Sequence, residues 1–177
     1  QRQMCIRDRF IAPSPGGDAV RNPNTLPTGR NLFGINAEAT PGVRAWDEGK
    51  ALAKSTLDRY YRKHGEYPRK VSYTFWAGEF IETEGATLAQ ALYMLGVAPV
   101  RDGMNRVTDL RLIPSAELGR PRIDVVVQTS GQLRDVAASR LELLTKAVKM
   151  VAQSENDTCG NYVSEGCLLY TSPSPRD

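Results

Sequence analysis

The sequence is poor in the residues that build metal, redox and disulfide sites. It has one histidine and three cysteines in 177 residues, and no two cysteines form a CxxC pair. It contains no GxxxxGK[ST] phosphate loop, which excludes an ATP site of that type within the chain. No apolar run approaches the length of a transmembrane helix. These absences exclude a disulfide framework and predict a soluble segment without a membrane span.

The two ends of the chain resemble translated adapter DNA. Residues 167–172 (CLLYTS) can be written as codons whose reverse complement, read in another frame, encodes residues 4–8 (MCIRD). Both ends therefore encode opposite strands of one DNA element, which resembles the transposon adapter used to prepare sequencing libraries. We expect residues 1–9 and 167–177 to be read-through artefacts that take no part in the natural fold.

Without these ends, the charges of the chain nearly balance. The ends carry four arginines and two aspartates, so their removal lowers the formal net charge from +3 to +1. They also carry Cys5 and Cys167, which leaves Cys159 as the single cysteine. A nearly neutral chain without a basic stripe gives no electrostatic reason to bind nucleic acid or an anionic membrane.

Helical and strand patterns alternate after an irregular first segment. Residues 10–39 are rich in proline, glycine and asparagine and follow neither hydrophobic period. Apolar residues recur at helical spacing in three segments, residues 40–64, 87–95 and 138–153. Four short segments have strand character, residues 71–76, 97–100, 107–113 and 123–129. This order predicts an α/β domain over residues 40–166, with an open, mainly parallel sheet flanked by helices, as in Rossmann-like and flavodoxin-like folds.

The same patterns predict some details of packing. Trp46, Leu57 and Tyr60 share one side of the first helix, so we expect them in the core rather than in a ring-stacking surface. Thr87 is expected to cap the second helix. Residues 123–129 lack strict alternation, which predicts a central strand buried on both faces.

Two polar segments follow predicted strands and mark a candidate site. Residues 77–85 (AGEFIETEG) follow one strand, and residues 130–135 (SGQLRD) follow another. Ligands of open α/β sheets approach the carboxyl ends of the strands. We therefore expect these two turns to meet at one rim of a common sheet and to face a shared ligand.

Several strings occur in the order and approximate spacing of one family. They include TGRNLFGIN (28–36), HGEYPRKV (64–71), LGVAPV (95–100) and ELGRPRIDVVV (117–127) followed by SGQLRD. From about residue 24 to residue 163, the chain resembles an internal fragment of the large subunit of the CobN cobalt chelatase and magnesium chelatase H family. The ELGRPRIDVVV string, with the TSG turn and RD after it, is the most specific element.

The resemblance implies insertion of a divalent metal into a tetrapyrrole, with Co²⁺ or Mg²⁺ as the substrate metal. It also implies that this subunit binds the macrocycle in the cytoplasm, while AAA-type motor subunits hydrolyse ATP. Leu133 and Val136 replace aromatic residues of the usual family pattern, which favours cobalt insertion in cobalamin biosynthesis. The alternatives are the magnesium chelatase H subunit, acting on protoporphyrin, and a scaffold or motor-docking domain. The principal catalytic carboxylate and histidine of the family lie upstream, so the fragment alone is expected to be inactive.

Glutamates after the first strand could supply the base that metal insertion requires. Insertion removes two protons from ring nitrogens, so a chelatase needs bases near the macrocycle. Glu79 lies nearest the strand end and is the catalytic candidate, while Glu82 and Glu84 are candidate substrate contacts. The alternative is that these glutamates are solvated or cap the next helix. His64, the only histidine, is expected to end a helix, and no protein-held metal is predicted.

Other polar residues could bind the carboxylates and amides of the macrocycle. Guanidinium groups bind carboxylates through two hydrogen bonds, which makes Arg134 a candidate together with its neighbours Ser130 and Asp135. The alternative for Arg134 and Asp135 is a structural ion pair at a helix start. Arg30 and Asn31 lie in a glycine-containing polar loop that could offer backbone N–H donors to an anion.

The GRPR string contains two further arginines. Arg120 and Arg122 flank Pro121, and both could bind carboxylates in the same way as Arg134. The alternative, which we favour from the sequence, is that they order the chain where it leads into a buried strand.

Overall fold

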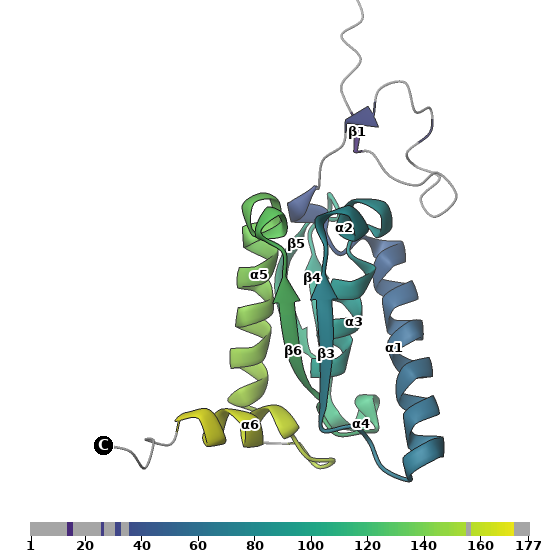
Figure 1. The fold of residues 1–177 in the computed structure, drawn as a ribbon, viewed down its shortest axis with the longest axis vertical. Helices are drawn as coiled ribbons and strands as arrows, with labels where there is room; N and C mark the ends of the chain where they lie inside the picture. Colours follow the sequence, from purple (N-terminus) through teal and green to yellow (C-terminus); the bar gives the residue numbers. More distant parts are fainter. Residues whose placement is uncertain (1–13, 16–25, 27–30, 33–35, 155–156, 172–177) are drawn as a thin grey trace, which may run out of the picture.

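The computed structural model describes residues 14–15, 26, 31–32, 36–154 and 157–171. The elements in these residues are β1 (Ser14–Pro15), β2 (Asn31–Leu32), η3 (Ala37–Ala39), α1 (Val43–His64), β3 (Lys70–Phe75), α2 (Ala77–Thr83), α3 (Ala86–Leu95), β4 (Val97–Arg101), β5 (Val107–Leu112), α4 (Ser115–Leu118), β6 (Asp124–Thr129), α5 (Gly131–Ala152) and α6 (Tyr162–Thr171). The expected α/β class, a parallel sheet flanked by helices, is confirmed (Figure 1).

The parallel pair β3–β6 is the ladder that positions the candidate site. Lys70 lies opposite Asp124 at one end, and Phe75 lies opposite Thr129 at the other. In Figure 1, α1 and α5 stand on the two sides of this pair and α3 lies behind it. Among the described residues this ladder has two strands, and β4 and β5 pair with each other in antiparallel fashion. The parallel sheet is therefore smaller than the sequence predicts.

Strand β6 is not buried on both faces, so that prediction was wrong. Val126 is 45% exposed, whereas Val125 and Val127 pack against the core. Side chains alternate between the two faces of a strand, so three consecutive valines cannot all point inward. The run of valines reflects the preference of β-branched residues for strands rather than burial on two sides.

Helix α1 packs closely against α3 through a stripe of small residues. The buried positions of α1 are four residues apart, at Ala45, Gly49, Ala53 and Leu57. A Cβ atom added at Gly49 would lie 2.6 Å from the Cβ of Ala89. The two helices therefore approach to a distance at which position 49 has no room for a side chain.

The predicted core face of α1 is right for Leu57 and wrong for Tyr60. Leu57 is buried, and Trp46 is half-buried with an edge-on contact to Tyr93, at 6.4 Å between ring centroids. Tyr60 is exposed and stacks on His64 at 4.3 Å. Because the buried stripe advances in steps of four residues, Tyr60 falls at its margin.

The start of α1 differs from the prediction, whereas its end agrees with it. The sequence predicts a helix from Thr40, but the N-cap is Gly42, and the Thr40 hydroxyl donates instead to the carbonyl of Asn36 (2.8 Å). The helix ends at Gly65, whose φ is 75° and whose N–H donates to the carbonyl of Tyr61 (2.8 Å). This left-handed conformation favours glycine.

Helix α3 lies between two hydrophobic clusters. Leu88, Leu92 and Leu95 belong to a cluster with Phe75 and α5, and Met94 belongs to a second cluster with α1 and Ile123. A helix that is apolar all round is a buried helix.

The N-cap of α3 is Gly85, and it makes no side-chain capping bond. The prediction that Thr87 caps this helix was therefore wrong. Thr87 lies inside the first turn, where its hydroxyl donates to Glu79.

Both polar segments of the candidate site are helical, although the sequence predicts turns. Residues 77–83 form α2, and residues 131–136 form the first part of α5. Helix α5 has a kink at Ala137, with φ −138° and ψ 32°. The predicted start at residue 138 therefore coincides with the regular part of the helix after the kink.

Helix α6 extends across residue 167, where the sequence predicts adapter-derived residues to begin. Asn161 caps its start, because its Oδ1 accepts from the N–H groups of Val163 (3.1 Å) and Ser164 (3.2 Å). Val163 is buried against the core. The domain limits remain predictions. No helix among the described residues is both long and apolar enough to cross a membrane.

Candidate functional site

The structure brings the two predicted polar segments to one rim of the β3–β6 ladder. Phe75 and Thr129 are partners at the carboxyl ends of the two parallel strands. The N–H of Ser130 donates to the carbonyl of Phe75 (3.3 Å), which joins the start of α5 to the end of β3. Helices α2 and α5 therefore begin beside each other at this rim, the upper one in Figure 1.

The carboxylate of Glu79 connects α2 to α3. Its Oε1 accepts from the hydroxyls of Thr83 (2.7 Å) and Thr87 (2.6 Å), and from the backbone N–H of Thr87 (3.4 Å). An acceptor at this place satisfies a free N–H group in the first turn of α3. One oxygen of Glu79 therefore caps α3, as the alternative prediction for these glutamates stated.

The second oxygen of Glu79 has a different environment. Oε2 is buried and has no hydrogen-bond partner among the described residues. An unpaired buried acceptor costs about 1–3 kcal/mol, so a hydrogen-bond donor that reached this atom would be stabilising. Glu79 therefore has one oxygen fixed by the fold and one buried oxygen without a partner among the described residues.

The two other glutamates of the segment differ from Glu79. Glu82 is exposed on α2. Glu84 follows α2 with a left-handed backbone (φ 53°), and its carbonyl accepts from the N–H of Gly42 (3.0 Å). Its carboxylate lies close to Gly42 as well, since a Cβ there would meet Oε2 of Glu84. Glu84 thus fixes the start of α1 to the rim, while Glu82 projects from it.

On the α5 side of the rim, Ser130 is the N-cap and its Oγ accepts from the N–H of Leu133 (3.2 Å). Arg134 and Asp135 are exposed on the first turns of α5. Within the described residues, neither side chain forms an ion pair. The alternative of a structural Arg134–Asp135 pair is therefore not what the structure shows.

The remaining predicted contacts cannot be placed at the rim. Arg30 lies outside the described residues. Asn31 lies in β2 opposite Ser14, and its side chain also lies outside the described part. Within that part, no group of three or more histidine, cysteine, aspartate or glutamate residues could hold a metal ion.

Sequence reasoning missed Trp76 at this rim. It is the N-cap residue of α2 and is 61% exposed, between buried Phe75 and buried Ala77. The prediction took Trp76 as the last residue of a strand buried on at least one face. The alternation of faces along β3 was the signal available, because an inward Phe75 implies an outward Trp76.

Two arginines behind the rim were also missed. Arg140 is buried and its Nη1 donates to the carbonyl of Thr40 (3.1 Å), while Nη2 of Arg101 donates to the carbonyl of Pro41 (2.6 Å). Burial lowers the pKa of both guanidinium groups, and nearby carboxylates such as Glu38 beside Arg140 oppose that shift. These arginines hold the segment before α1 against the rim. The sequence signal that could have revealed Arg140 is its position within the apolar stripe of α5.

The chain is similar in sequence to subunits of metal chelatases. Residues 4–172 match the family CobN/Magnesium Chelatase. Magnesium-chelatase subunit ChlH, chloroplastic, of Oryza sativa subsp. indica is 40% identical over 162 residues, which are 91% of this chain and 12% of that protein. Aerobic cobaltochelatase subunit CobN of Sinorhizobium sp is 39% identical over 154 residues, 86% of this chain and 12% of that protein.

A solved structure supports the same relationship. The catalytic subunit of cobaltochelatase from Mycobacterium tuberculosis is 41% identical, with a TM-score of 0.81 over 92% of this chain and 14% of that one. This chain spans about 12% of the length of the two curated relatives. The resemblance seen in the sequence motifs is thereby confirmed, and the chain belongs to the CobN/magnesium chelatase family.

Proposed function

We propose that the chain is a substrate-contacting segment of the large subunit of an ATP-dependent cobalt chelatase, which inserts Co²⁺ into a corrin precursor in cobalamin biosynthesis. The observation that carries this proposal is the rim of the β3–β6 ladder, where the half-buried residue Glu79 and the exposed residue Arg134 follow paired strands. The names of its relatives, magnesium chelatase and cobaltochelatase subunits, support a metal chelatase.

The chemistry assigned to Glu79 is proton removal. As a divalent ion enters the ring it loses bound water, and two pyrrole-type N–H groups lose their protons while nitrogen–metal bonds form. A positioned carboxylate accelerates such a proton transfer. Oε2 of Glu79 is the atom for this step, because Oε1 is already used by Thr83 and Thr87. Since Oε2 is buried in this chain, the proposal requires a shift of α2 that exposes it to the macrocycle.

The α5 side of the rim would bind the periphery of the macrocycle. Arg134 is exposed and unpaired among the described residues, so its guanidinium can pair with a rim carboxylate of the ligand. Ser130 and Asp135 lie beside it, and Glu82 lies on the α2 side. Trp76 adds an exposed aromatic face at the same rim. Arg30 and Asn31 remain candidates from the sequence alone.

The choice of cobalt rests on residues rather than on overall similarity. The relatives named for magnesium and for cobalt are 40% and 39% identical to this chain. Leu133 and Val136 stand where the usual family pattern has aromatic residues, and this departure favours the cobalt branch. A magnesium chelatase H subunit acting on protoporphyrin is the second candidate. Partner subunits of the AAA type would hydrolyse ATP in the cytoplasm, in keeping with the lack of a phosphate loop in this sequence.

A scaffold or motor-docking role is the third candidate, and the capping bonds of Glu79 favour it. The test uses the full-length subunit with its motor partners. Glu79→Gln keeps an oxygen for Thr87 but removes the base, so cobalt insertion should fall about 100-fold or more at unchanged tetrapyrrole affinity. Arg134→Ala should weaken tetrapyrrole binding about 10-fold.

Matched controls are Glu142→Gln and Arg62→Ala, exposed residues of α5 and α1. If Glu79→Gln and Arg134→Ala behave like these controls in both insertion and binding, the scaffold role is correct and the substrate-contacting role is wrong. Faster insertion of Mg²⁺ than of Co²⁺ by the wild-type complex would favour the magnesium chelatase instead.

A further inference from the structure

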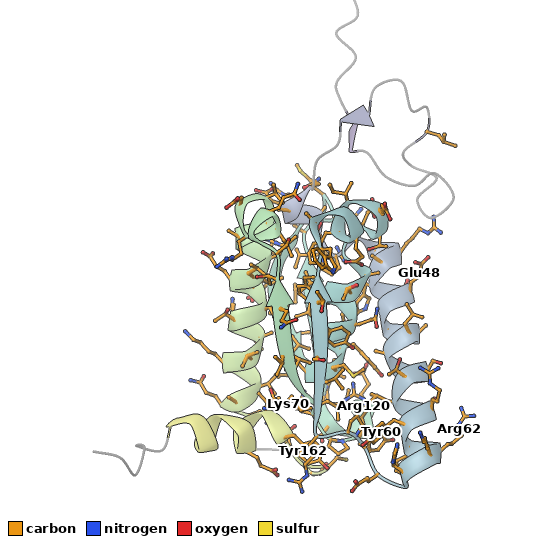
Figure 2. All side chains as sticks on the ribbon, viewed as in Figure 1. Glu48, Tyr60, Arg62, Lys70, Arg120 and Tyr162 are labelled. Carbon is orange, nitrogen blue, oxygen red and sulfur yellow. The ribbon has the colours of Figure 1, made fainter. Side chains whose placement is uncertain are left out.

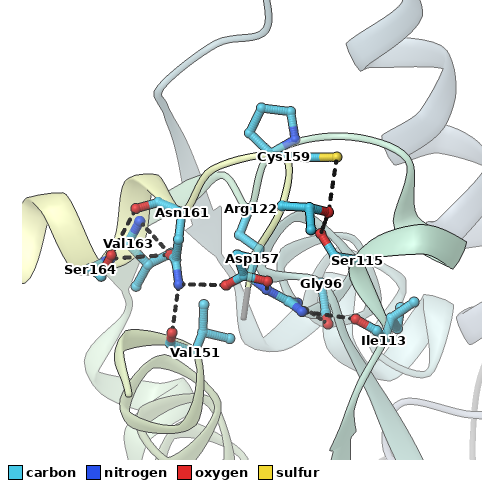
Figure 3. Close-up of polar contacts among 12 residues, drawn as sticks. Gly96, Ile113, Ser115, Arg122, Val151, Asp157, Cys159, Asn161, Val163 and Ser164 are labelled. Atoms are coloured by element: carbon cyan, nitrogen blue, oxygen red, sulfur yellow. Dashed lines mark hydrogen bonds and ion pairs between the residues drawn. The ribbon is translucent and has the colours of Figure 1, made fainter. Parts of the chain in front are cut away.

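The two arginines of the GRPR string have opposite electrostatic environments. Arg122 forms an ion pair with Asp157 at 2.6 Å, with both side chains almost fully buried, and donates to the carbonyls of Gly96 (2.7 Å) and Ile113 (2.8 Å) (Figure 3). Arg120 is only 5% exposed, yet it forms no ion pair within the described part of the chain. The charge of Arg122 is compensated, and that of Arg120 is not.

Arg120 also has unused hydrogen-bonding capacity. A guanidinium group has five N–H donors. Three are directed at backbone carbonyls: Nη1 donates to Met94 (3.2 Å) and Pro121 (2.9 Å), and Nη2 donates to Tyr93 (2.5 Å). The Nε atom is buried and has no partner among the described residues. The group also lies over the ring of Tyr93, at 4.8 Å from the centroid.

Arg120 lines a small pocket between α1 and the segment before β3. The pocket has a volume of about 110 Å³, and the residues around it include Lys54, Asp58 and Tyr67. At about 30 Å³ for each water, this space holds three or four water molecules. It is large enough for a carboxylate on a short stem, and too small for a macrocycle.

The groups closest to Arg120 do not neutralise it. Burial lowers its pKa, and the tyrosines Tyr93 and Tyr67 oppose that shift. Burial raises the pKa of nearby Tyr73 to about 12, so this neighbour is an uncharged phenol at neutral pH. Asp58 lies at the pocket but forms no ion pair in the described structure. A buried charge without a partner is costly, and an external anion would offset that cost.

We propose that the pocket at Arg120 binds a carboxylate group. Its source is either an acidic side chain from another part of the full-length subunit or a small free carboxylate. The planar guanidinium matches a carboxylate in geometry. Lys54 adds a positive charge at the pocket, which the negative charge of Asp58 partly offsets, so Arg120 supplies the main attraction. Figure 2 shows Arg120 at the same end of β3 as its first residue, Lys70, and Glu79 follows the opposite end of that strand. The pocket is therefore separate from the rim site, and its test does not depend on the proposed function.

The direct test observes the Nε–H signal of Arg120 by ¹⁵N NMR in the 177-residue chain while sodium acetate is added. A saturable shift that sodium chloride at equal ionic strength does not reproduce is expected. A shift that does not saturate, or that chloride reproduces, overturns the proposal.

Two variants locate the binding to this pocket. Arg120→Lys should weaken acetate binding about 10-fold or more, because the planar pair is lost. Lys54→Gln changes an exposed residue and leaves the buried network intact, so it keeps the test valid if Arg120→Lys does not fold. It should weaken acetate binding about 3-fold. The control is Lys63→Gln, an exposed residue of α1 that does not line the pocket. Unchanged acetate affinity in folded Lys54→Gln overturns the proposal.

Equilibrium dialysis with labelled acetate then distinguishes the two sources. If the 177-residue chain binds acetate and the full-length subunit does not, a carboxylate of the subunit itself occupies the pocket. If both bind acetate, the pocket takes a free carboxylate. If the 177-residue chain binds none, the proposal is wrong.

Discussion

The hydroxyl of Thr87 donates to Oε1 of Glu79 at 2.6 Å, and this bond fastens α2 onto the first turn of α3. It is a charge-assisted bond between two helices that are separated by only two residues, Glu84 and Gly85. The same carboxylate thus stabilises the local fold with one oxygen, and the proposed proton transfer uses the other. The two roles can be separated by experiment, because they use different atoms.

Replacing Thr87 by alanine should lower the free energy of unfolding by about 1–2 kcal/mol, since one partner of a charge-assisted bond is removed. Urea denaturation followed by circular dichroism measures this change. Thr108→Ala is the control, because the Thr108 hydroxyl makes an exposed 3.4 Å bond to the carbonyl of Val100. That control should change stability by no more than about 0.5 kcal/mol. Equal losses in the two variants would show that the link from Thr87 to Glu79 does not stabilise the domain.

Replacing Asp157 by asparagine should destabilise the chain by about 3–5 kcal/mol, because Arg122 would keep a buried charge without its carboxylate partner. Denaturant unfolding gives the value. Glu48→Gln is the matched control, since the pair between Arg44 and Glu48 is about half exposed on both sides, at 52% and 54%. Its loss should cost less than about 1 kcal/mol. A small effect of Asp157→Asn would mean that the carbonyl acceptors around Arg122 are enough to stabilise its buried charge.

Gly49→Ala should destabilise the domain by about 1–3 kcal/mol through overpacking. The added Cβ would lie 2.6 Å from the Cβ of Ala89 and 2.7 Å from the carbonyl oxygen of Ala86, which is backbone and cannot easily move. Thermal unfolding compares this variant with Gly78→Ala, where no atom of the described residues lies within 4 Å of the new Cβ. Alanine at position 78 should raise stability by up to about 1 kcal/mol, because it favours the helix. A harmless Gly49→Ala would show that α1 can move away from α3.

The β4–β5 turn should open as the pH falls. The N–H of Arg106 donates to Oδ1 of Asp102 (2.9 Å) and its guanidinium to Oδ2 (2.8 Å), and these bonds lower the pKa of Asp102. A depressed carboxyl pKa contributes stability above the ordinary aspartate pKa, and this is lost as the pH falls through the lower folded value. The amide signal of Arg106 should therefore shift with an acidic midpoint below that of an ordinary aspartate. In Asp102→Asn that titration should be absent, and its persistence would assign the shift to another group.

Most of the elements could be predicted from the sequence because their signals are local. Helix α1 ends at His64 as the sequence predicts, and β3 begins one residue before its predicted start. The features that were predicted wrongly depend on tertiary contacts. Glu79 acts as a cap for α3 from eight residues upstream of Thr87, which spacing within the helix cannot reveal.

In the candidate site, too, local features could be predicted from the sequence and tertiary contacts could not. That both polar segments follow strands can be read from composition, and the parallel pairing of Phe75 with Thr129 brings them to one rim. The alternation of faces along β3 was a signal for the exposed Trp76. The sequence could not indicate that Oε2 of Glu79 is buried and has no partner among the described residues, because that depends on which atoms of α2 and α3 meet. The different roles of Arg120 and Arg122, two residues apart, also depend on partners that are distant in sequence, such as Asp157.

The position of α3 between the two hydrophobic clusters affects how the domain can open. Between Leu88 and Leu95 all its residues except the half-buried Gln90 are buried, and they contribute to both clusters. Deuterium should therefore reach the amide of Leu92 only when the whole domain unfolds. The exchange rate at that one position would report the global stability of the chain without any denaturant.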